Sequence, residues 1–121
     1  MESRYSARVP VECSVVFAGE ALIGEGRVVD VSLPGCLMES PEAVKPGDYV
    51  QLKLFLPDQQ PAIRVPLAVV RWAQGSRVGV EFIRSSEDDQ IRLTRFVRRY
   101  RRQASVPKWE GGIEILSAAV D

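Results

Sequence analysis

The amino-acid sequence predicts a mainly β protein, a small six-stranded antiparallel β-barrel followed by a C-terminal α-helix. Apolar and polar residues alternate along several short segments, and turns containing Gly or Pro separate these segments at intervals typical of barrel strands. Beyond residue 84 the spacing of the apolar residues changes to the period of an amphipathic helix. The chain has 121 residues, of which 45% are hydrophobic and 26% charged, and this is enough for one domain with one core.

The six strands are expected where apolar side chains recur with a period of two. Gly19 and Gly24 bracket the turn between the first strand and the second. In the fifth segment the apolar phase shifts near Val69 and Val70, which predicts a β-bulge or a doubly buried stretch. In chain order, the expected strands span residues 9–17, 27–31, 36–39, 50–56, 63–72 and 78–82.

A helix is expected after the last strand. Ser85 or Ser86 can cap it, and the acidic residues 87–89 suit the positive end of its dipole. Its apolar stripe, with the spacing i, i+3, i+4 and i+7, consists of Leu93, Phe96, Val97 and Tyr100. The helix also has a basic surface, which we interpret as a solvated face, or else as a docking face for an acidic partner or nucleic acid. This surface comprises Arg92, Arg95, Arg98, Arg99, Arg101 and Arg102. We expect the barrel and helix to occupy residues 1–103, followed by a tail of unknown structure over 104–121.

The composition argues against several classes of function. The sequence contains no histidine, which removes the commonest general base, the commonest metal ligand and every histidine-activated nucleophile. The net charge of zero disfavours a general nucleic-acid binder. Cys13 and Cys36 are too few for a four-thiolate zinc site, so we interpret them as small buried thiols, with a disulfide as the alternative. No metal or cofactor is therefore expected.

The sequence also predicts a cytoplasmic location. The first eight residues contain no apolar run of the kind found in a signal peptide. No window approaches the roughly 20 apolar residues that a membrane-spanning helix needs.

Two short patterns contain the candidate binding residues. Arg4-x-x-x-Arg8 precedes the first strand, and Asp30-x-Ser32-x-x-Gly35 ends the second. Arginine can pair bidentately with a phosphate or a guanine edge, and aspartate can accept hydrogen bonds from donors on a ligand. Serine offers a hydroxyl, and glycine allows a close backbone approach or a positive φ. By themselves, these residue types indicate a planar anion that carries hydrogen-bond donors.

Together and in this order, the two patterns resemble those of the PilZ domain, a bacterial module that binds cyclic di-GMP. The resemblance extends over about residues 1–103, where Val70-Arg71-Trp72 and Gly79-Val80-Glu81-Phe82 look like the closing strands of the family. It implies a cyclic di-GMP receptor with a downstream protein partner, and a binding module rather than an enzyme. The implied ligand-binding residues are Arg4, Arg8, Asp30, Ser32 and Gly35. The family often has a second Arg beside the first motif Arg, whereas this chain has Tyr5, which leaves open whether one ligand or an intercalated pair binds.

The expected mechanism is an ordering of the N-terminal segment. We expect residues 1–8 to be mobile without the ligand and ordered with it, which hydrogen exchange at Ser3 to Val9 would test. Three alternatives remain: an adaptor of the same fold that does not bind the nucleotide, a small-barrel nucleic-acid binder that uses the basic helix, and nucleotide hydrolysis. The intact motifs argue against the first, the zero net charge against the second, and the lack of a catalytic cluster against the third.

Overall fold

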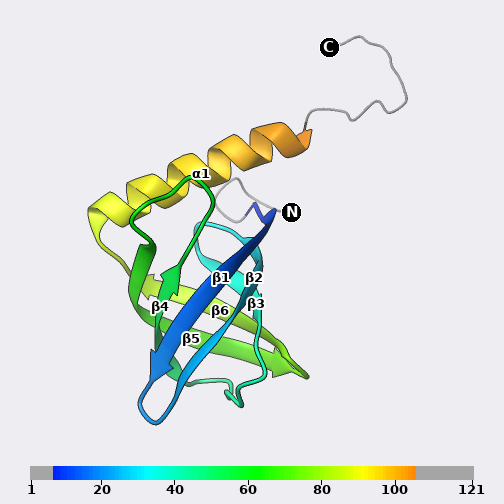
Figure 1. The fold of residues 1–121 in the computed structure, drawn as a ribbon, viewed down its shortest axis with the longest axis vertical. Helices are drawn as coiled ribbons and strands as arrows, with labels where there is room; N and C mark the ends of the chain where they lie inside the picture. Colours follow the sequence, from blue (N-terminus) through cyan, green and yellow to red (C-terminus); the bar gives the residue numbers. More distant parts are fainter. Residues whose placement is uncertain (1–6, 106–121) are drawn as a thin grey trace.

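The chain forms six strands along which buried and exposed residues alternate, and these strands close into one antiparallel barrel. The computed structural model describes residues 7–105, and the barrel order is β1-β2-β3-β6-β5-β4 (Figure 1). This confirms the predicted fold class. The strands are β1 (Val9–Gly19), β2 (Ile23–Val31), β3 (Gly35–Glu39), β4 (Tyr49–Leu54), β5 (Ile63–Gln74) and β6 (Arg77–Arg84).

The second strand begins at Ile23, four residues earlier than the sequence pattern predicted. The amide of Gly19 donates to the carbonyl of Leu22 at 2.7 Å, so the chain turns within three residues and pairing resumes at once. Gly24 therefore lies in the strand opposite Phe17, rather than in the turn. A Cβ at Gly24 would overlap the Phe17 ring, so this glycine makes room for a core aromatic.

The phase shift predicted in the fifth strand is present. The pairing of β5 with β6 slips between Leu67 and Ala68 and again between Val70 and Trp72. As a result three consecutive residues, 68–70, are buried, which strict alternation does not allow. The second slip leaves Trp72 43% exposed at the barrel surface.

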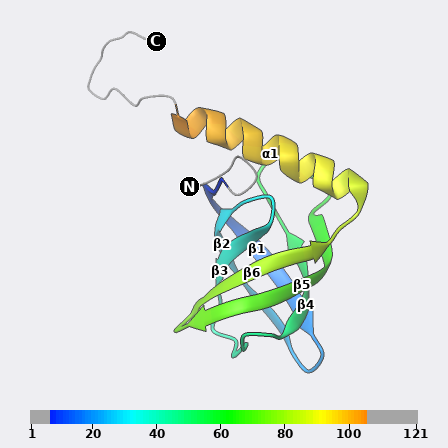
Figure 2. The same ribbon diagram turned by 180° about the vertical axis from the view of Figure 1, so that it is seen from behind.

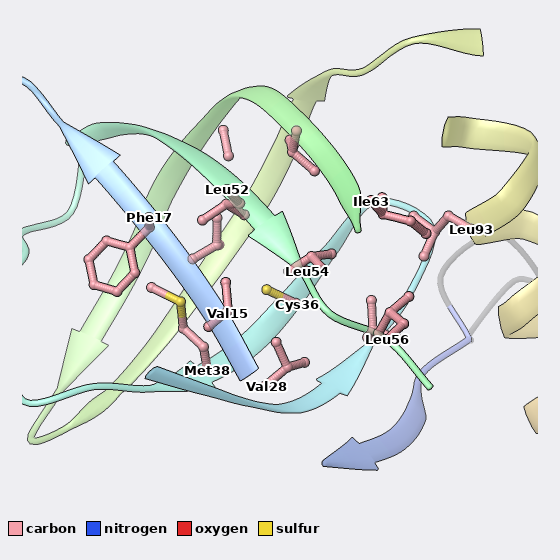
Figure 3. Packing of buried hydrophobic residues seen from close by; sticks show 14 of the residues in the cluster. Val15, Phe17, Val28, Cys36, Met38, Leu52, Leu54, Leu56, Ile63 and Leu93 are labelled. Atoms are coloured by element: carbon pink, nitrogen blue, oxygen red, sulfur yellow. The ribbon is translucent and has the colours of Figure 1, made fainter. Parts of the chain in front are cut away.

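Aliphatic side chains from the strands fill the barrel interior. In β4, for example, Val50, Leu52 and Leu54 are buried while the intervening residues are exposed. The largest fully buried side chains are Phe96, from the helix, and Met38, from β3. Figure 3 shows this packing, and its labelled side chains are Val15, Phe17, Val28, Cys36, Met38, Leu52, Leu54, Leu56, Ile63 and Leu93.

The helix α1 (Glu87–Ser105) covers one end of the barrel and contacts β1 and β5 (Figures 1 and 2). Of the two candidate caps, Ser86 is the N-cap of the helix, because its Oγ accepts a hydrogen bond from the amide of Asp89 at 3.1 Å. The predicted stripe faces the core: Leu93, Phe96 and Val97 are at most 5% exposed. Full burial of such a side chain contributes about 1.5–3 kcal/mol, which holds the helix on the barrel. Within residues 7–105, no helix is long and apolar enough to span a membrane.

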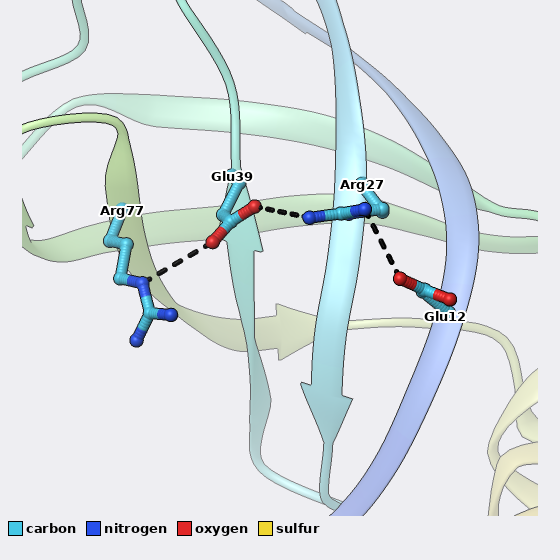
Figure 4. Close-up of polar contacts among 4 residues, drawn as sticks. All are labelled: Glu12, Arg27, Glu39 and Arg77. Atoms are coloured by element: carbon cyan, nitrogen blue, oxygen red, sulfur yellow. Dashed lines mark hydrogen bonds and ion pairs between the residues drawn. The ribbon is translucent and has the colours of Figure 1, made fainter.

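Four charged side chains cross the outer surface of four neighbouring strands, and we call them the charge ladder. Arg27 of β2 donates to Glu12 of β1 at 3.1 Å and to Oε1 of Glu39 of β3 at 2.7 Å (Figure 4). Arg77 of β6 lies 3.3 Å from Oε2 of Glu39. The hydrogen bond and charge of Arg27, assisted by Arg77, hold the pKa of Glu39 below its usual range.

Candidate ligand-binding site

Pairing between the first two strands brings Arg8 and Asp30 together. Val9 pairs with Val31 and Pro10 with Asp30, so the start of β1 lies beside the end of β2. Arg8, immediately before β1, donates from Nη1 to Oδ1 of Asp30 at 3.0 Å. The Arg8 side chain is 59% exposed and that of Asp30 is 22% exposed. Two residues 22 positions apart thus form one exposed arginine–carboxylate pair.

Ser32 and Gly35 build the turn that joins β2 to β3. Both the amide and the hydroxyl of Ser32 donate to the carbonyl of Gly35, at 2.8 Å and 3.2 Å. Ser32 is buried, and the hydrogen bond from its hydroxyl stabilises the turn. The chain also makes a close approach at Gly35, where a Cβ would strike the carbonyl of Val80 in β6. Of the two roles considered for this glycine, the structure supports the close approach, because positive φ among described glycines occurs at Gly47 and Gly75.

A surface hollow of about 190 Å³ collects most of the predicted residues. Asp30 does not line this hollow but is held at its edge through the bond to Arg8. The walls come from the β2–β3 turn and from β5 and β6; the lining residues are Arg8, Ser32, Pro34, Gly35, Cys36, Arg71, Trp72, Gly79, Val80 and Glu81.

Among the lining residues that were not assigned to the site from the sequence, Arg71, Trp72 and Glu81 have charged or aromatic side chains. The Trp72 indole lies over Gly79, because a Cβ at that position would overlap it. Arg71 and Glu81 form an ion pair in which Nε and Nη2 both lie 2.5 Å from Oε1. The sequence did contain a signal: these residues are in the two segments that resemble closing strands. Their approach to the motif depends on the pairing of β3 with β6, which sequence alternation does not specify.

Arg4 lies outside the described residues, as do residues 1–6 of the segment expected to become ordered and residues 106–121 of the tail; α1 continues to Ser105, two residues beyond the expected boundary at 103. Arg8, Asp30, Ser32 and Gly35 are therefore the predicted site residues that the structure places.

Cys36, one of the lining residues of the hollow, has a buried thiol. Burial, and to a lesser extent the charge of Asp30, raises the pKa of Cys36 to about 12. Burial likewise raises the pKa of Cys13 to about 11. Both cysteines are free and remain protonated at neutral pH. Among residues 7–105, moreover, no cluster of His, Cys, Asp or Glu could hold a metal ion.

A larger hollow of about 540 Å³ lies elsewhere, over β1, β4 and β5 and the start of α1. It is lined mainly by apolar groups, among them Val16, Ile23 and Pro66, and by none of the four described motif residues. Asp89 lines it and pairs with Arg92 at 2.8 Å, but this pair lies within one helix at i and i+3. The smaller hollow is the candidate ligand site, because Arg8, Ser32 and Gly35 of the two motifs line it.

Comparisons with known proteins identify the family and agree with the barrel fold. The model of the PilZ domain family matches residues 2–99. The PilZ domain of CeSA from a cellulose-synthesizing bacterium has a TM-score of 0.61 and 19% identity, covering 78% of this chain and 97% of that one. The PilZ domain of YcgR from Escherichia coli, solved with c-di-GMP, has a TM-score of 0.64 and 16% identity, covering 85% and 95%.

A third structure is that of the inhibitor of motility MotI/DgrA from Bacillus subtilis. Its TM-score is 0.72 at 18% identity; the alignment covers 87% of this chain and 54% of that one. No curated protein matches the sequence significantly. At these identities the structures establish a shared fold, and the family model extends over most of the chain. On the family match and the barrel topology together, this chain belongs to the PilZ domain family, whose members are binding or adaptor modules.

Proposed function

We propose that this PilZ domain is a receptor for cyclic di-GMP that reports the second messenger to a protein partner. The observation that carries the proposal is the convergence of Arg8, Ser32 and Gly35 on one hollow, with Asp30 paired to Arg8 at its edge. The PilZ domain of E. coli YcgR, which shares the fold, was solved with c-di-GMP.

The chemistry of the ligand suits these groups. Cyclic di-GMP carries two phosphates and two guanines, so it offers negative charge and also hydrogen-bond donors. Arg8 uses one of its five N–H donors to bind Asp30. Because its side chain is 59% exposed, the other donors can bind a phosphate or guanine O6 and N7. Asp30 can accept from guanine N1 and N2. A charge-assisted hydrogen bond contributes about 1.5–3 kcal/mol, so about four would support micromolar binding, which needs about 8 kcal/mol.

The size of the hollow indicates how the ligand would lie. About 190 Å³ is below the roughly 300–1,000 Å³ of pockets for drug-sized molecules. The described hollow would therefore hold part of the dinucleotide, with the remainder on the surface. We assign Arg4 to that remainder, where it would contribute a second guanidinium from the N-terminal segment.

Titration calorimetry with cyclic di-GMP tests the proposal. We expect saturable binding at micromolar concentration or tighter, and far weaker binding of cyclic di-AMP, which lacks the N1 proton and N2 amine that Asp30 would recognise. A folded protein that releases no binding heat with cyclic di-GMP up to millimolar concentration would instead be an adaptor of the PilZ fold.

A further inference from the structure

The hollow contains a second arginine–carboxylate pair that the two motifs do not include. Arg71 of β5 and Glu81 of β6 line the same hollow as Arg8, and Oε1 of Glu81 lies 2.5 Å from both Nε and Nη2 of Arg71. We propose that Arg71 and Glu81 form a second guanine-recognition pair, so that each base of the dinucleotide meets one arginine and one carboxylate. This inference rests on the proposed function and deepens it.

The strand pairing keeps this second pair open toward the hollow. Glu81 of β6 pairs directly with Gly35 of β3, and cross-strand partners point to the same face of a sheet. Gly35 has no side chain, so β3 places nothing over the Glu81 carboxylate, which is 42% exposed. The motif glycine thus allows the close approach of β3 to β6 and also leaves Glu81 uncovered.

The hydrogen bonding within the pair leaves groups available for a ligand. Both bonds from Arg71 end on Oε1, and among the described residues none donates to Oε2 of Glu81. Nη1 of Arg71 likewise has no acceptor among them. A free carboxylate oxygen beside a free guanidinium nitrogen complements guanine, which presents donors at N1 and N2 and acceptors at O6 and N7. Adenine has an acceptor at N1 and a donor at N6, so it fits poorly.

The charge ladder, whose four side chains line a separate hollow of about 460 Å³, provides a comparison within this chain. Each oxygen of Glu39 already has an arginine partner there, Oε1 from Arg27 and Oε2 from Arg77. Glu81 differs because one oxygen stays available. A cross-strand pair that served only the sheet would also contribute little, since exposed ion pairs are worth about 0–1 kcal/mol.

The test measures binding of cyclic di-GMP, cyclic GMP–AMP and cyclic di-AMP to the full chain by calorimetry. For Glu81→Gln we expect the affinity for cyclic di-GMP to fall about tenfold to a hundredfold, as for the loss of one good base contact. The preference of the unmodified protein for cyclic di-GMP over cyclic GMP–AMP should disappear, because one base is then no longer read. Arg71→Lys, which keeps the charge but loses the fork, should lower the affinity about tenfold.

Glu12→Gln and Arg77→Lys are the matched controls, because they alter ladder pairs outside the hollow and should leave all three affinities unchanged. Unfolding midpoints without ligand establish that the variants are folded. If the unmodified protein binds cyclic di-GMP and Glu81→Gln binds it equally well or more tightly, with the same preference among the three ligands, the second pair is refuted and the proposed function stands. Absence of binding by the unmodified protein refutes both.

Discussion

Arg8 combines a defined position with free hydrogen-bonding capacity. Its guanidinium is anchored to Asp30 at 3.0 Å while 59% of the side chain remains exposed. An anchored guanidinium loses less freedom on binding than an unrestrained one, so more of its interaction energy is available to the ligand. The same pair contributes little to the fold, because it lies at the surface.

Arg8→Ala should therefore abolish measurable binding of cyclic di-GMP while the fold survives. Loss of the charge-assisted contacts should cost a few kcal/mol of binding energy. Arg8→Lys should also bind poorly, because an ammonium cannot replace the planar fork. Calorimetry measures the affinities, and Arg95→Ala, on the exposed face of α1, is the control. Unchanged affinity in Arg8→Ala would show that the ligand binds at another place.

Gly35 needs a different test because its effect is on packing. A Cβ at residue 35 would overlap the Val80 carbonyl, so Gly35→Ala must push β3 away from β6. We expect the free energy of unfolding to fall by about 1–3 kcal/mol, as in other overpacked sites. Urea unfolding measures this, with Gly19→Ala as the milder comparison, where a Cβ would come to 3.3 Å from the Tyr49 carbonyl. Equal stability of the two variants would contradict the close approach.

Among the elements, the helix depends on its first turn. Ser86 Oγ accepts from the amide of Asp89, one of the N–H groups that lack a partner within the helix. Ser86→Ala should lower the free energy of unfolding by about 1 kcal/mol. Ser85→Ala is a closely matched control, because Ser85 contributes a backbone carbonyl to Gln90 that the substitution retains. A larger loss in Ser85→Ala than in Ser86→Ala would mean that the cap has been misidentified.

The charge ladder ties strands together in a way that depends on pH. The pKa of Glu39 is depressed in the folded state, chiefly by Arg27. Its stabilisation is therefore present above the pKa of an unfolded glutamate and is lost as the pH falls through the folded value. The difference in unfolding free energy between the unmodified protein and Glu39→Gln should be largest near neutral pH and shrink in acid. Urea unfolding over a pH series measures it, and added salt should reduce it.

The exposed Glu20 provides the control for that series. No ion pair involves Glu20 among the described residues, so Glu20→Gln should show no comparable pH dependence. A constant difference between the unmodified protein and Glu39→Gln at every pH would mean that the ladder is not electrostatic.

The whole barrel should respond to the ligand, because the site draws on β2, β3, β5 and β6 together with Arg8, which precedes β1. A ligand at 100 times its dissociation constant stabilises the native state by about 2.7 kcal/mol. For a domain of this size, that corresponds to a rise in Tm on the order of 10 °C. Thermal unfolding with cyclic di-GMP should show this rise, and Arg8→Ala should not. An equal rise in both proteins would place the binding site elsewhere on the barrel.

Much of the architecture follows from local sequence patterns. Alternation specifies which face of each strand is buried, and a change of period marks where the helix begins. Ser86 and the apolar stripe follow from the same local rules, and they lie where the sequence predicted them. The phase shift at Val69 and Val70 was visible because three buried residues in a row disrupt a period of two. The early start of β2 was not visible in the sequence, because the role of Gly24 depends on the Phe17 ring from another strand.

The sequence by itself determined the six strands, the capped helix and the two motifs, because each depends on residues close together along the chain. Only the tertiary structure decided that β3 pairs with β6, which brings Gly35 opposite Glu81 and places Arg71 and Trp72 beside the motif. Alternation shows which side chains face outward, but it carries no information on which strand will be the neighbour. That choice is made when the barrel closes, because every edge strand must find a hydrogen-bonding partner while all six apolar faces share one core.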